Sequence, residues 1–386
     1  MSKFKMIAKT LFGFEPLLAE ELRKLGAGDI QSGNRMVSFT GDLGFLYKAN
    51  LSLRTALKIL KPIQSKRVFS EDQLYRFVQS IDWNLYLDES ETFAVQSTVY
   101  STVFTHSHYV ALKVKDAIVD QFHKQTGSRP DVNTDHPDVQ IQVHIHKDLC
   151  TISLDSSGES LHQRGYRSIT NQAPINEVLA AGLLLHSDWN GQSAFLDPMC
   201  GSGTLAIEAA MIACQIPPLI NRKEFAFEKW LDWDLELFET IEAAMLKKVQ
   251  DTRFPIFAWD IQAASVKKAE RNAQNANLSE FITFETEDFF ASTKPVDGHL
   301  HMIFNPPYGE RMPIPEDDFY KHMGDTLKQN YPDTSAWFIT SQIEAHKFVG
   351  LRPSRKIKVF NAKLESRLFN FQIYSGSKKA KYQSEK

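Results

Sequence analysis

A run of small and acidic residues at positions 196–204 has the composition of a ligand-binding turn. It reads Leu-Asp-Pro-Met-Cys-Gly-Ser-Gly-Thr, between a short apolar stretch and an almost wholly apolar one at 203–214. Glycines between a strand and a helix permit a tight turn and let a ligand approach the helix N-terminus. The third glycine of the dinucleotide fingerprint is missing, and Asp197 places an acceptor in the crevice. The turn therefore favours a ligand with a cationic or amine group over a pyrophosphate.

A second chemical motif, Asn305-Pro306-Pro307-Tyr308-Gly309, follows the apolar segment 300–304. The two prolines fix the backbone and remove two N–H donors. The Asn305 side-chain oxygen and the Pro306 carbonyl can then accept hydrogen bonds from an amino group, while Tyr308 stacks on its ring. We expect these three residues to hold a planar base that carries an exocyclic –NH₂.

Two further acids stand at the ends of predicted strands. Asp260 follows the segment 255–259, and Asp288 follows 282–285. In parallel α/β sheets, ligands bind outside the carboxyl ends of the strands, and an acceptor at such a position commonly meets ribose hydroxyls. The two acids are expected to line the same crevice as Asp197.

The elements that must position these motifs fall into a parallel α/β domain and two smaller modules. From about residue 172, apolar strand-like and helix-like segments alternate, which is typical of a parallel sheet, with an insertion at 215–254. Residues 1–60 follow a βαββαβ order, which suggests a ferredoxin-like sheet. Residues 61–160 combine a helix at 108–124 with a hairpin at 139–154. We expect domains at 1–60, 61–160 and 161–376, with a polar tail at 377–386.

Composition excludes several classes of protein. Apolar residues make up 42% and charged residues 24% of the 386, so disorder is not the main state, and the net charge of −3 excludes binding of nucleic acid by bulk charge alone. The cysteines, Cys150, Cys200 and Cys214, provide no disulfide framework or zinc-type spacing and fit a reducing compartment. With no signal-like N-terminus and no apolar run of the roughly 18 residues that span a membrane, the expected location is the cytoplasm, away from membranes.

Together, the motifs at 197–204 and 305–308 resemble class I S-adenosylmethionine-dependent methyltransferases that modify exocyclic amino nitrogens. The module at 61–160 resembles a THUMP RNA-binding domain. The connector 161–167 and the segment 173–181 resemble those of the THUMP-containing guanine-N2 methyltransferases of bacterial 23S ribosomal RNA, both the N-terminal half of a bifunctional enzyme and its stand-alone relatives. The resemblance covers nearly the whole chain. It implies an α/β fold with a Rossmann-like class I methyltransferase domain preceded by α+β ferredoxin-like and THUMP modules.

The resemblance also implies an activity and a site. The expected reaction is methyl transfer from S-adenosylmethionine, without a metal, to the N2 amino group of a guanine in RNA, with 23S rRNA or a large-subunit precursor as partner. Asp260 would bind the ribose, and Asp288 with Phe289 would face the adenine. The implied cofactor-binding residues are Asn176, Asp197, Pro198, Met199, Gly201, Gly203, Thr204, Asp260, Ile261, Asp288, Phe289 and Asn305, and the implied catalytic residues are Asn305, Pro306 and Tyr308.

RNA contacts and alternative functions complete the expectations. The basic residues expected to contact RNA are Lys113, Lys115, Arg164 and Arg167, and a further basic cluster lies at Lys58, Lys61, Lys66 and Arg67. Cys200 lies in the cofactor turn rather than the base-facing motif, so it is expected to pack rather than act as a nucleophile. Two alternatives stay open: an adenine-N6 methyltransferase acting on RNA or DNA, and a non-catalytic RNA-binding assembly factor.

Overall fold

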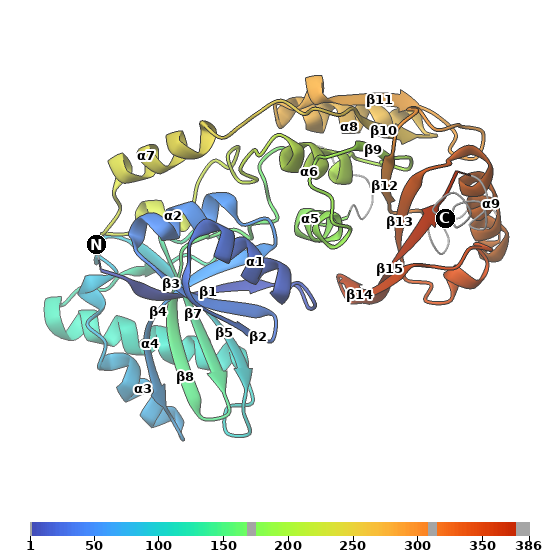
Figure 1. The fold of residues 1–386 in the computed structure, drawn as a ribbon. Helices are drawn as coiled ribbons and strands as arrows, with labels where there is room; N and C mark the ends of the chain where they lie inside the picture. Colours follow the sequence, from blue (N-terminus) through green and yellow to red (C-terminus); the bar gives the residue numbers. More distant parts are fainter. Residues whose placement is uncertain (1, 168–174, 308–314, 376–386) are drawn as a thin grey trace. The chain divides into compact units, whose positions relative to one another are not determined.

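The computed structural model describes residues 2–167, 175–307 and 315–375 (Figure 1). The chain divides into two units. Unit 1 comprises Met1–Thr10, Ala19–Leu161 and Lys223–Ala243, and unit 2 comprises Leu11–Leu18, His162–Arg222 and Ala244–Lys386. Within the described ranges, no helix has the length and apolar character needed to cross a bilayer.

Unit 1 begins with the βαββαβ order that the sequence predicts. Its second helix begins with a polar cap, because the Asp42 side chain accepts a hydrogen bond from the Phe45 N–H. The elements in chain order are β1 (Phe4–Thr10), α1 (Glu15–Leu25), β2 (Gly28–Gly33), β3 (Met36–Gly41), α2 (Leu43–Ser52), β4 (Ala56–Arg67), α3 (Glu71–Gln79), β5 (Thr92–Tyr100), α4 (Ser107–Thr126), β6 (Asp131–Val132), β7 (Val139–His146) and β8 (Leu149–Asp155).

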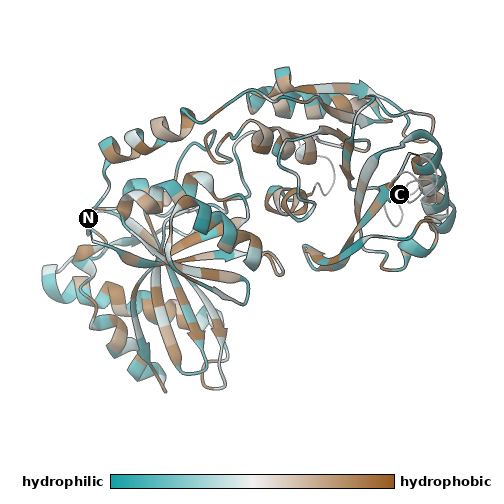
Figure 2. Cartoon of the chain, viewed as in Figure 1, coloured by the Kyte–Doolittle hydropathy of each residue, from teal (hydrophilic) through white to brown (hydrophobic). Residues whose placement is uncertain are grey.

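All eight strands of unit 1 form one sheet, in the order β2-β3-β1-β4-β8-β7-β5-β6. Strand β4 joins the two predicted modules, because it pairs with β1 on one side and with β8 on the other. The expected boundary at 60/61 therefore falls inside β4. Strands β7 and β8 form the predicted hairpin through a two-residue turn in which Lys147 has φ +57°. Figure 2 shows hydrophilic and hydrophobic residues interspersed along these strands.

Unit 2 contains a seven-stranded sheet in the order β11-β10-β9-β12-β13-β15-β14. Strands β9 to β13 run parallel, and β15 is antiparallel to both of its neighbours. The elements in chain order are α5 (Glu177–His186), β9 (Ala194–Asp197), α6 (Thr204–Ala213), β10 (Ile256–Asp260), α8 (Ala263–Asn275), β11 (Ile282–Thr286), β12 (Leu300–Phe304), α9 (Glu316–Asn330), β13 (Thr334–Thr340), β14 (Arg355–Asn361) and β15 (Leu364–Ile373).

Much of the insertion at 215–254 belongs to unit 1 rather than to the sheet of unit 2. Its helix α7 (Leu235–Leu246) follows an aromatic segment that surrounds Tyr47 of α2. The Tyr47 ring lies 4.7 Å from Phe227 and 5.1 Å from Trp233, measured between centroids, and its hydroxyl accepts a hydrogen bond from the Asp234 N–H. The aromatic residues of the insertion thus supply part of the apolar core of unit 1.

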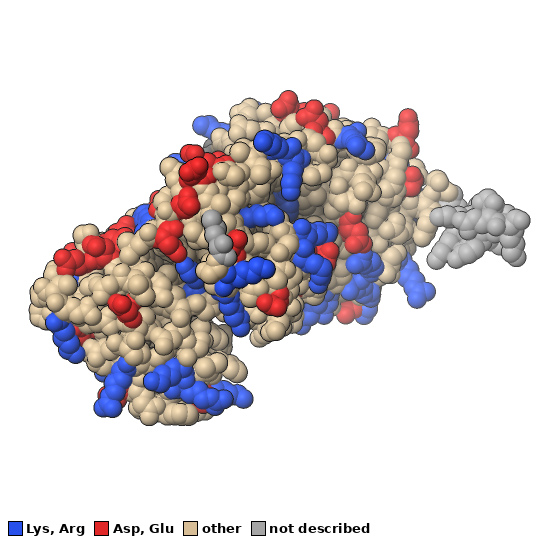
Figure 3. All heavy atoms as spheres, turned by 60° about the vertical axis from the view of Figure 1, so that its left-hand side comes forward, with Lys and Arg blue, Asp and Glu red and all other residues tan. Residues whose placement is uncertain are grey.

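The surface carries both signs of charge. The chain has 44 Lys and Arg against 47 Asp and Glu, and Figure 3 shows both kinds on the side that it draws. Sequence-independent attraction to phosphate scales with clustered positive charge. Any anionic partner must therefore be recognised by a local arrangement of basic residues.

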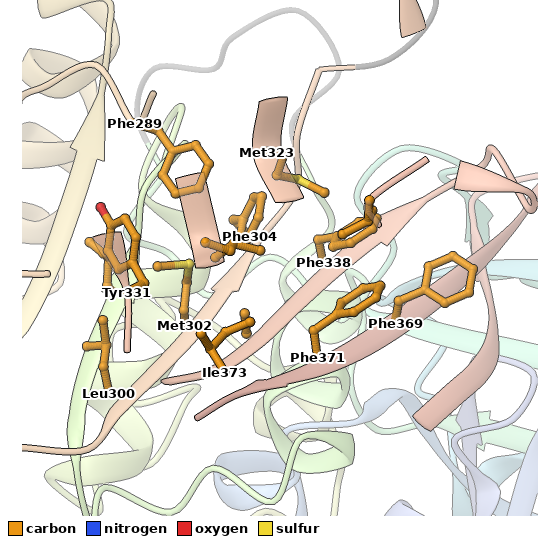
Figure 4. Close-up of a cluster of buried hydrophobic side chains, with 14 of the residues drawn as sticks. Phe289, Leu300, Met302, Phe304, Met323, Tyr331, Phe338, Phe369, Phe371 and Ile373 are labelled. Carbon is orange, nitrogen blue, oxygen red and sulfur yellow. The ribbon is translucent and has the colours of Figure 1, made fainter. Parts of the chain in front are cut away.

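A single apolar cluster supports the carboxyl end of β12, where the second motif begins. All five residues of β12 are buried, and Phe304 packs near Phe289 and Phe338, with ring centroids 5.7 and 5.9 Å away (Figure 4). Close-packed aromatic rings resist displacement because lost contacts are not regained elsewhere. Asn305, the next residue, therefore projects from a rigid support.

Candidate active site

The glycine turn follows β9, the central strand of the parallel region. Asp197 ends this strand and is 1% exposed, and its carboxylate accepts a hydrogen bond from the Met199 N–H at 3.2 Å. Gly203, with φ +81°, leaves no room for a side chain, because an added Cβ would lie 2.9 Å from that of Ala269. Helix α6 starts directly after it without a side-chain cap, so its first N–H groups are available to a ligand.

Asp260 ties the second strand end to this turn. Strand β10 lies parallel to β9, and the Asp260 carboxylate accepts hydrogen bonds from the N–H groups of Gly201 and Gln262, both at 2.9 Å. Burial raises the pKa of Asp197 well above its ordinary value, and the nearby Asp260 carboxylate raises it further. A ligand that brings a cation and hydroxyl donors would relieve both effects. The neighbouring Ile261 is 64% exposed and offers an apolar surface beside the carboxylate.

The third strand end is only partly as predicted. Asp288 is half-buried after β11, and its carboxylate accepts a hydrogen bond from the Phe290 N–H at 2.9 Å. Phe289 is 3% exposed, and its ring packs against Phe304 and Tyr331. The Phe289 ring thus belongs to the apolar core, and the expected contact of this residue with the cofactor stays a prediction.

Asn305 has a buried hydrogen-bond acceptor that no described residue uses. Its side-chain Oδ1 is buried and has no hydrogen-bond partner among the described residues. A buried acceptor without a donor costs about 1–3 kcal/mol, so native structures rarely keep one unless a ligand satisfies it. Pro306 follows without an N–H to offer, and Tyr308 lies outside the described residues. The Asn305 oxygen is therefore a ready acceptor for an amino group.

The sheet topology explains why these residues meet. The chain order of the strands reverses between β9 and β12, with β10 and β11 to one side and β13 to the other. At such a reversal the loops after adjacent strands diverge and leave a crevice outside the carboxyl ends. Asp197, Asp260 and Asp288 stand at the carboxyl ends of the strands on one side, and Asn305 follows the first strand on the other. The crevice can therefore hold a nucleoside-bearing ligand along the acids and a second group at Asn305.

Comparison with known proteins agrees with this geometry. Residues 164–370 match the family model described as the RMKL-like methyltransferase domain, 69–155 match a THUMP domain, and 5–60 match an RlmL ferredoxin-like domain. The chain belongs to the RMKL-like methyltransferase family. The predicted fold class, a Rossmann-like class I domain preceded by ferredoxin-like and THUMP modules, is thereby confirmed.

Individual relatives of this RMKL-like methyltransferase cover most of its length. A Synechocystis protein named as an RNA methyltransferase, slr0064, is 35% identical over 365 residues, 94% of this chain and 95% of that protein. The ribosomal RNA large subunit methyltransferase K/L of Syntrophotalea carbinolica is 35% identical over 381 residues, and the chain spans 53% of its length. The crystal structure of SMU.472, a methyltransferase in complex with SAH, superposes with a TM-score of 0.87 at 29% identity, covering 98% of this chain and all of that one.

Arg164 does not lie where RNA could reach it. Its side chain and that of Glu208 on α6 are fully buried, and its Nε lies 3.1 Å from a carboxylate oxygen of Glu208. The prediction that Arg164 contacts RNA is wrong, because this buried ion pair occupies the guanidinium. The sequence held one signal: Glu208 is the only charged residue in the otherwise apolar helix Thr204–Ala213.

Arg167 is also engaged inside the RMKL-like domain. Its guanidinium donates hydrogen bonds to the Thr204 hydroxyl at 2.9 Å and to the Ile175 carbonyl at 3.2 Å, and its Nε lies 2.8 Å from a Glu177 carboxylate oxygen. It thereby links the first residues of α5 and α6. Sequence reasoning missed this bracing contact on the cofactor turn, and the predicted contact of Arg167 with RNA stays a prediction.

Asn176, Lys113 and Lys115, which the sequence predicts to contact the cofactor or RNA, each contact nearby residues of the chain. The Asn176 side chain caps α5 by accepting hydrogen bonds from the Val178 and Leu179 N–H groups, and its contact with the cofactor stays a prediction. On α4, Lys113 lies over the Tyr75 ring and Lys115 pairs with Asp116.

Cys200 supports no covalent chemistry. It is buried, and burial raises the pKa of its thiol well above the ordinary value, so a thiolate nucleophile is disfavoured. Among the residues of known placement, no cluster of His, Cys, Asp and Glu has the arrangement of a metal site. The described residues of the crevice offer hydrogen-bond acceptors and backbone N–H groups to a ligand.

Proposed function

We propose that this protein transfers a methyl group from S-adenosylmethionine to the exocyclic N2 amino group of a guanine in RNA, and that this RNA is 23S ribosomal RNA. The observation that carries the proposal is the buried Oδ1 of Asn305 at the carboxyl end of β12, which has no hydrogen-bond partner within the ranges that the structure describes. This acceptor lacks a donor, and the planar amino group of a purine can supply one.

The residues of the crevice fit S-adenosylmethionine. The cofactor brings an ammonium group, ribose hydroxyls and an adenine amino group, each of which donates hydrogen bonds. Asp197, with its burial-raised pKa, gains from a nearby cation, and Asp260 can share its carboxylate with ribose hydroxyls. Gly203 keeps the backbone close, and the uncapped start of α6 can receive the carboxylate.

Catalysis on this account is largely positioning. S-adenosylmethionine supplies an electrophilic methyl group. The lone pair of a guanine amino nitrogen is delocalised into the ring, so the nitrogen is a poor nucleophile. Hydrogen bonds from that –NH₂ to Asn305 Oδ1 and the Pro306 carbonyl favour a pyramidal nitrogen with a localised lone pair. Because these acceptors are fixed in advance by the core under β12, they need no reorganisation during the reaction.

RNA is favoured as the substrate by the N-terminal modules. Residues 69–155 match a THUMP domain, and relatives that align with 94% and 96% of this chain are named as RNA and ribosomal RNA methyltransferases. The Asn-Pro-Pro-Tyr motif would equally suit an adenine N6 amino group, which makes an adenine-N6 methyltransferase the second candidate. The two candidates differ in the product base and can be separated directly.

The test is methyl transfer by the purified full chain to transcribed 23S rRNA, followed by digestion and mass spectrometry of the nucleosides. Wild-type protein should form N2-methylguanosine. Asn305→Ala should slow turnover about 10²–10³-fold, as loss of a preorganised polar contact does, while SAH binding by calorimetry stays unchanged. Asn34→Ala, at an exposed turn of unit 1, is the matched control.

Three results would count against the proposal. N6-methyladenosine as the product would establish the second candidate, and methylation of DNA alone would remove the RNA assignment. Full activity of Asn305→Ala would remove the role given to its amide oxygen.

A further inference from the structure

The sheet of unit 1 has one face covered by helices and one polar face. On β7, Ile141, Val143 and Ile145 are buried while Gln142, His144 and His146 alternate with them and are less buried. Helix α4 packs on the neighbouring strand β5, with Val110 and Val114 buried. Because successive side chains in a strand point to opposite faces, the polar set lies on the face away from α4.

Strand register extends this polar face across five strands. His144 of β7 stands opposite Thr98 of β5 and Thr151 of β8, and Thr151 stands opposite Ser65 of β4. On the far side of β4, Lys58 pairs in register with Lys9 of β1. We call this surface the open face, defined by Lys5, Lys9, Lys58, Ser65, Arg67, Gln96, Thr98, Tyr100, Gln142, His144, His146, Thr151, Ser153 and Asp155.

The basic groups of the open face outnumber its acids. On strands β1, β4, β5, β7 and β8, within the part of the chain that the structure describes, the only acid of this face is Asp155. It is buried, and Lys58 pairs with it at 2.6 Å. Lys5, Lys9 and two histidines remain on the face without a carboxylate. A surface of this kind attracts a polyanion.

Lys9 is the group that most needs an anion. Its ammonium is half-buried, and no described residue accepts a hydrogen bond from it or pairs with it. Burial lowers the pKa of Lys9. The pKa of His144 is also lowered, first by burial and then by the charges of Lys9 and His146. Both basic side chains are therefore partly withdrawn from water on the open face, where phosphate groups would stabilise their charged forms.

The helix-covered side differs in its balance of charges. Helices α3 and α4 carry Glu71, Asp72, Asp116 and Asp120, and the hydroxyls of Tyr75 and Tyr109 already donate to two of these acids. The same helices also carry Arg76, Lys113, Lys115 and Lys124, so acids and bases balance there, whereas bases outnumber acids on the open face.

We propose that the open face of unit 1 docks the phosphate–ribose backbone of the substrate RNA, with Lys9 of β1 and His144 of β7 among the groups that contact its phosphates. The hydroxyl and amide side chains of β5, β7 and β8 provide the donors and acceptors that ribose groups need. Tyr100, 65% exposed beside His144 with ring centroids 6.2 Å apart, offers an aromatic surface for an unpaired base. The inference rests on the proposed function, because it names the surface that holds that RNA.

The test compares the affinity of full-length variants for a 23S rRNA transcript at several salt concentrations. Lys9→Gln removes one cation, and Thr98→Glu adds an anion at an exposed position of the open face. Lys124→Gln and Ser128→Glu, both exposed at the end of α4 and beyond it, are the matched controls. Lys9→Gln should lower the salt slope of log K by about one unit, as loss of one phosphate contact does. Thr98→Glu should weaken binding more, and both should raise the KM for RNA with kcat unchanged.

The outcomes separate this inference from the proposed function. Wild-type affinity and salt slope for both open-face variants would overturn it, as would loss of affinity in Lys113→Gln alone. SAH binding, measured on each variant by calorimetry, should be unchanged. A fall in SAH affinity would show that the substitution disturbs the fold or the cofactor site rather than an RNA surface, and this result would also overturn the inference. If wild-type protein methylates no RNA yet its affinity for the transcript falls in both variants, the proposed function fails while the docking surface stands.

Discussion

Breaking the buried ion pair between Arg164 and Glu208 should destabilise unit 2 by a large and specific amount. Both side chains are fully buried, and the Nε to carboxylate distance is 3.1 Å. Arg164→Met removes the cation and leaves Glu208 charged in the interior, next to the first turns of α6. Removing one partner of a buried pair costs about 3–5 kcal/mol, because the remaining charge is uncompensated.

Replacing both residues shows whether the loss of stability comes from the uncompensated charge. Arg164→Met with Glu208→Leu removes both charges and keeps similar side-chain volumes, so the double variant should be close to wild type or more stable. For a unit of about 200 residues, a loss of about 3–5 kcal/mol corresponds to a fall in Tm of roughly 6–20 °C. The double variant should recover most of that fall.

Thermal and urea unfolding of the three proteins, followed by circular dichroism, measures these differences. The reasoning would be refuted if Arg164→Met unfolded at the wild-type temperature, since that would place its guanidinium in water. It would be refuted equally if the double variant were no more stable than the single one, because the cost would then come from lost packing rather than from the orphaned charge.

Three further perturbations follow from the structure. Gly203→Ala forces a side chain onto a residue at φ +81° and should cost roughly 1–2 kcal/mol and weaken SAH binding; unchanged calorimetry would contradict the role of the turn. Burial lowers the pKa of His301 to about 3. As the pH falls, the unfolded chain therefore protonates this histidine before the folded chain does, and the free energy of unfolding decreases below about pH 6.5. That loss, about 2 kcal/mol between pH 6.5 and 5 in urea titrations, should be absent in His301→Phe. Phe227→Ala, 4.7 Å from Tyr47, should destabilise unit 1 by about 3–5 kcal/mol in urea unfolding, and an unaffected unit 1 would show that the insertion adds nothing to its core.

The crevice was predictable because its residues follow strands. Asp197 and Asp260 end the strands β9 and β10, Asn305 comes directly after β12, and parallel strands bring their carboxyl ends to one edge. Local sequence therefore carries enough information to gather them. The same holds for the hairpin β7–β8, whose alternation and turn lie within one short segment.

Other features depend on partners that local sequence does not show. Arg164 looks like a surface charge until Glu208, 44 positions away, is seen beside it. Phe289 adjoins a site residue but its ring points into the core. Strand β4 runs past the expected boundary at residue 60, because pairing with β8 extends it, and strand pairing cannot be deduced from either strand alone.

The central claim, methylation of a guanine amino group in ribosomal RNA, is tested most directly in cells. Nucleosides from 23S rRNA of a strain lacking the gene would be compared by mass spectrometry with those of the parent strain and of a strain complemented with Asn305→Ala. The account predicts the loss of one N2-methylguanosine in the deletion strain, and no recovery with the variant. An unchanged nucleoside profile would contradict it.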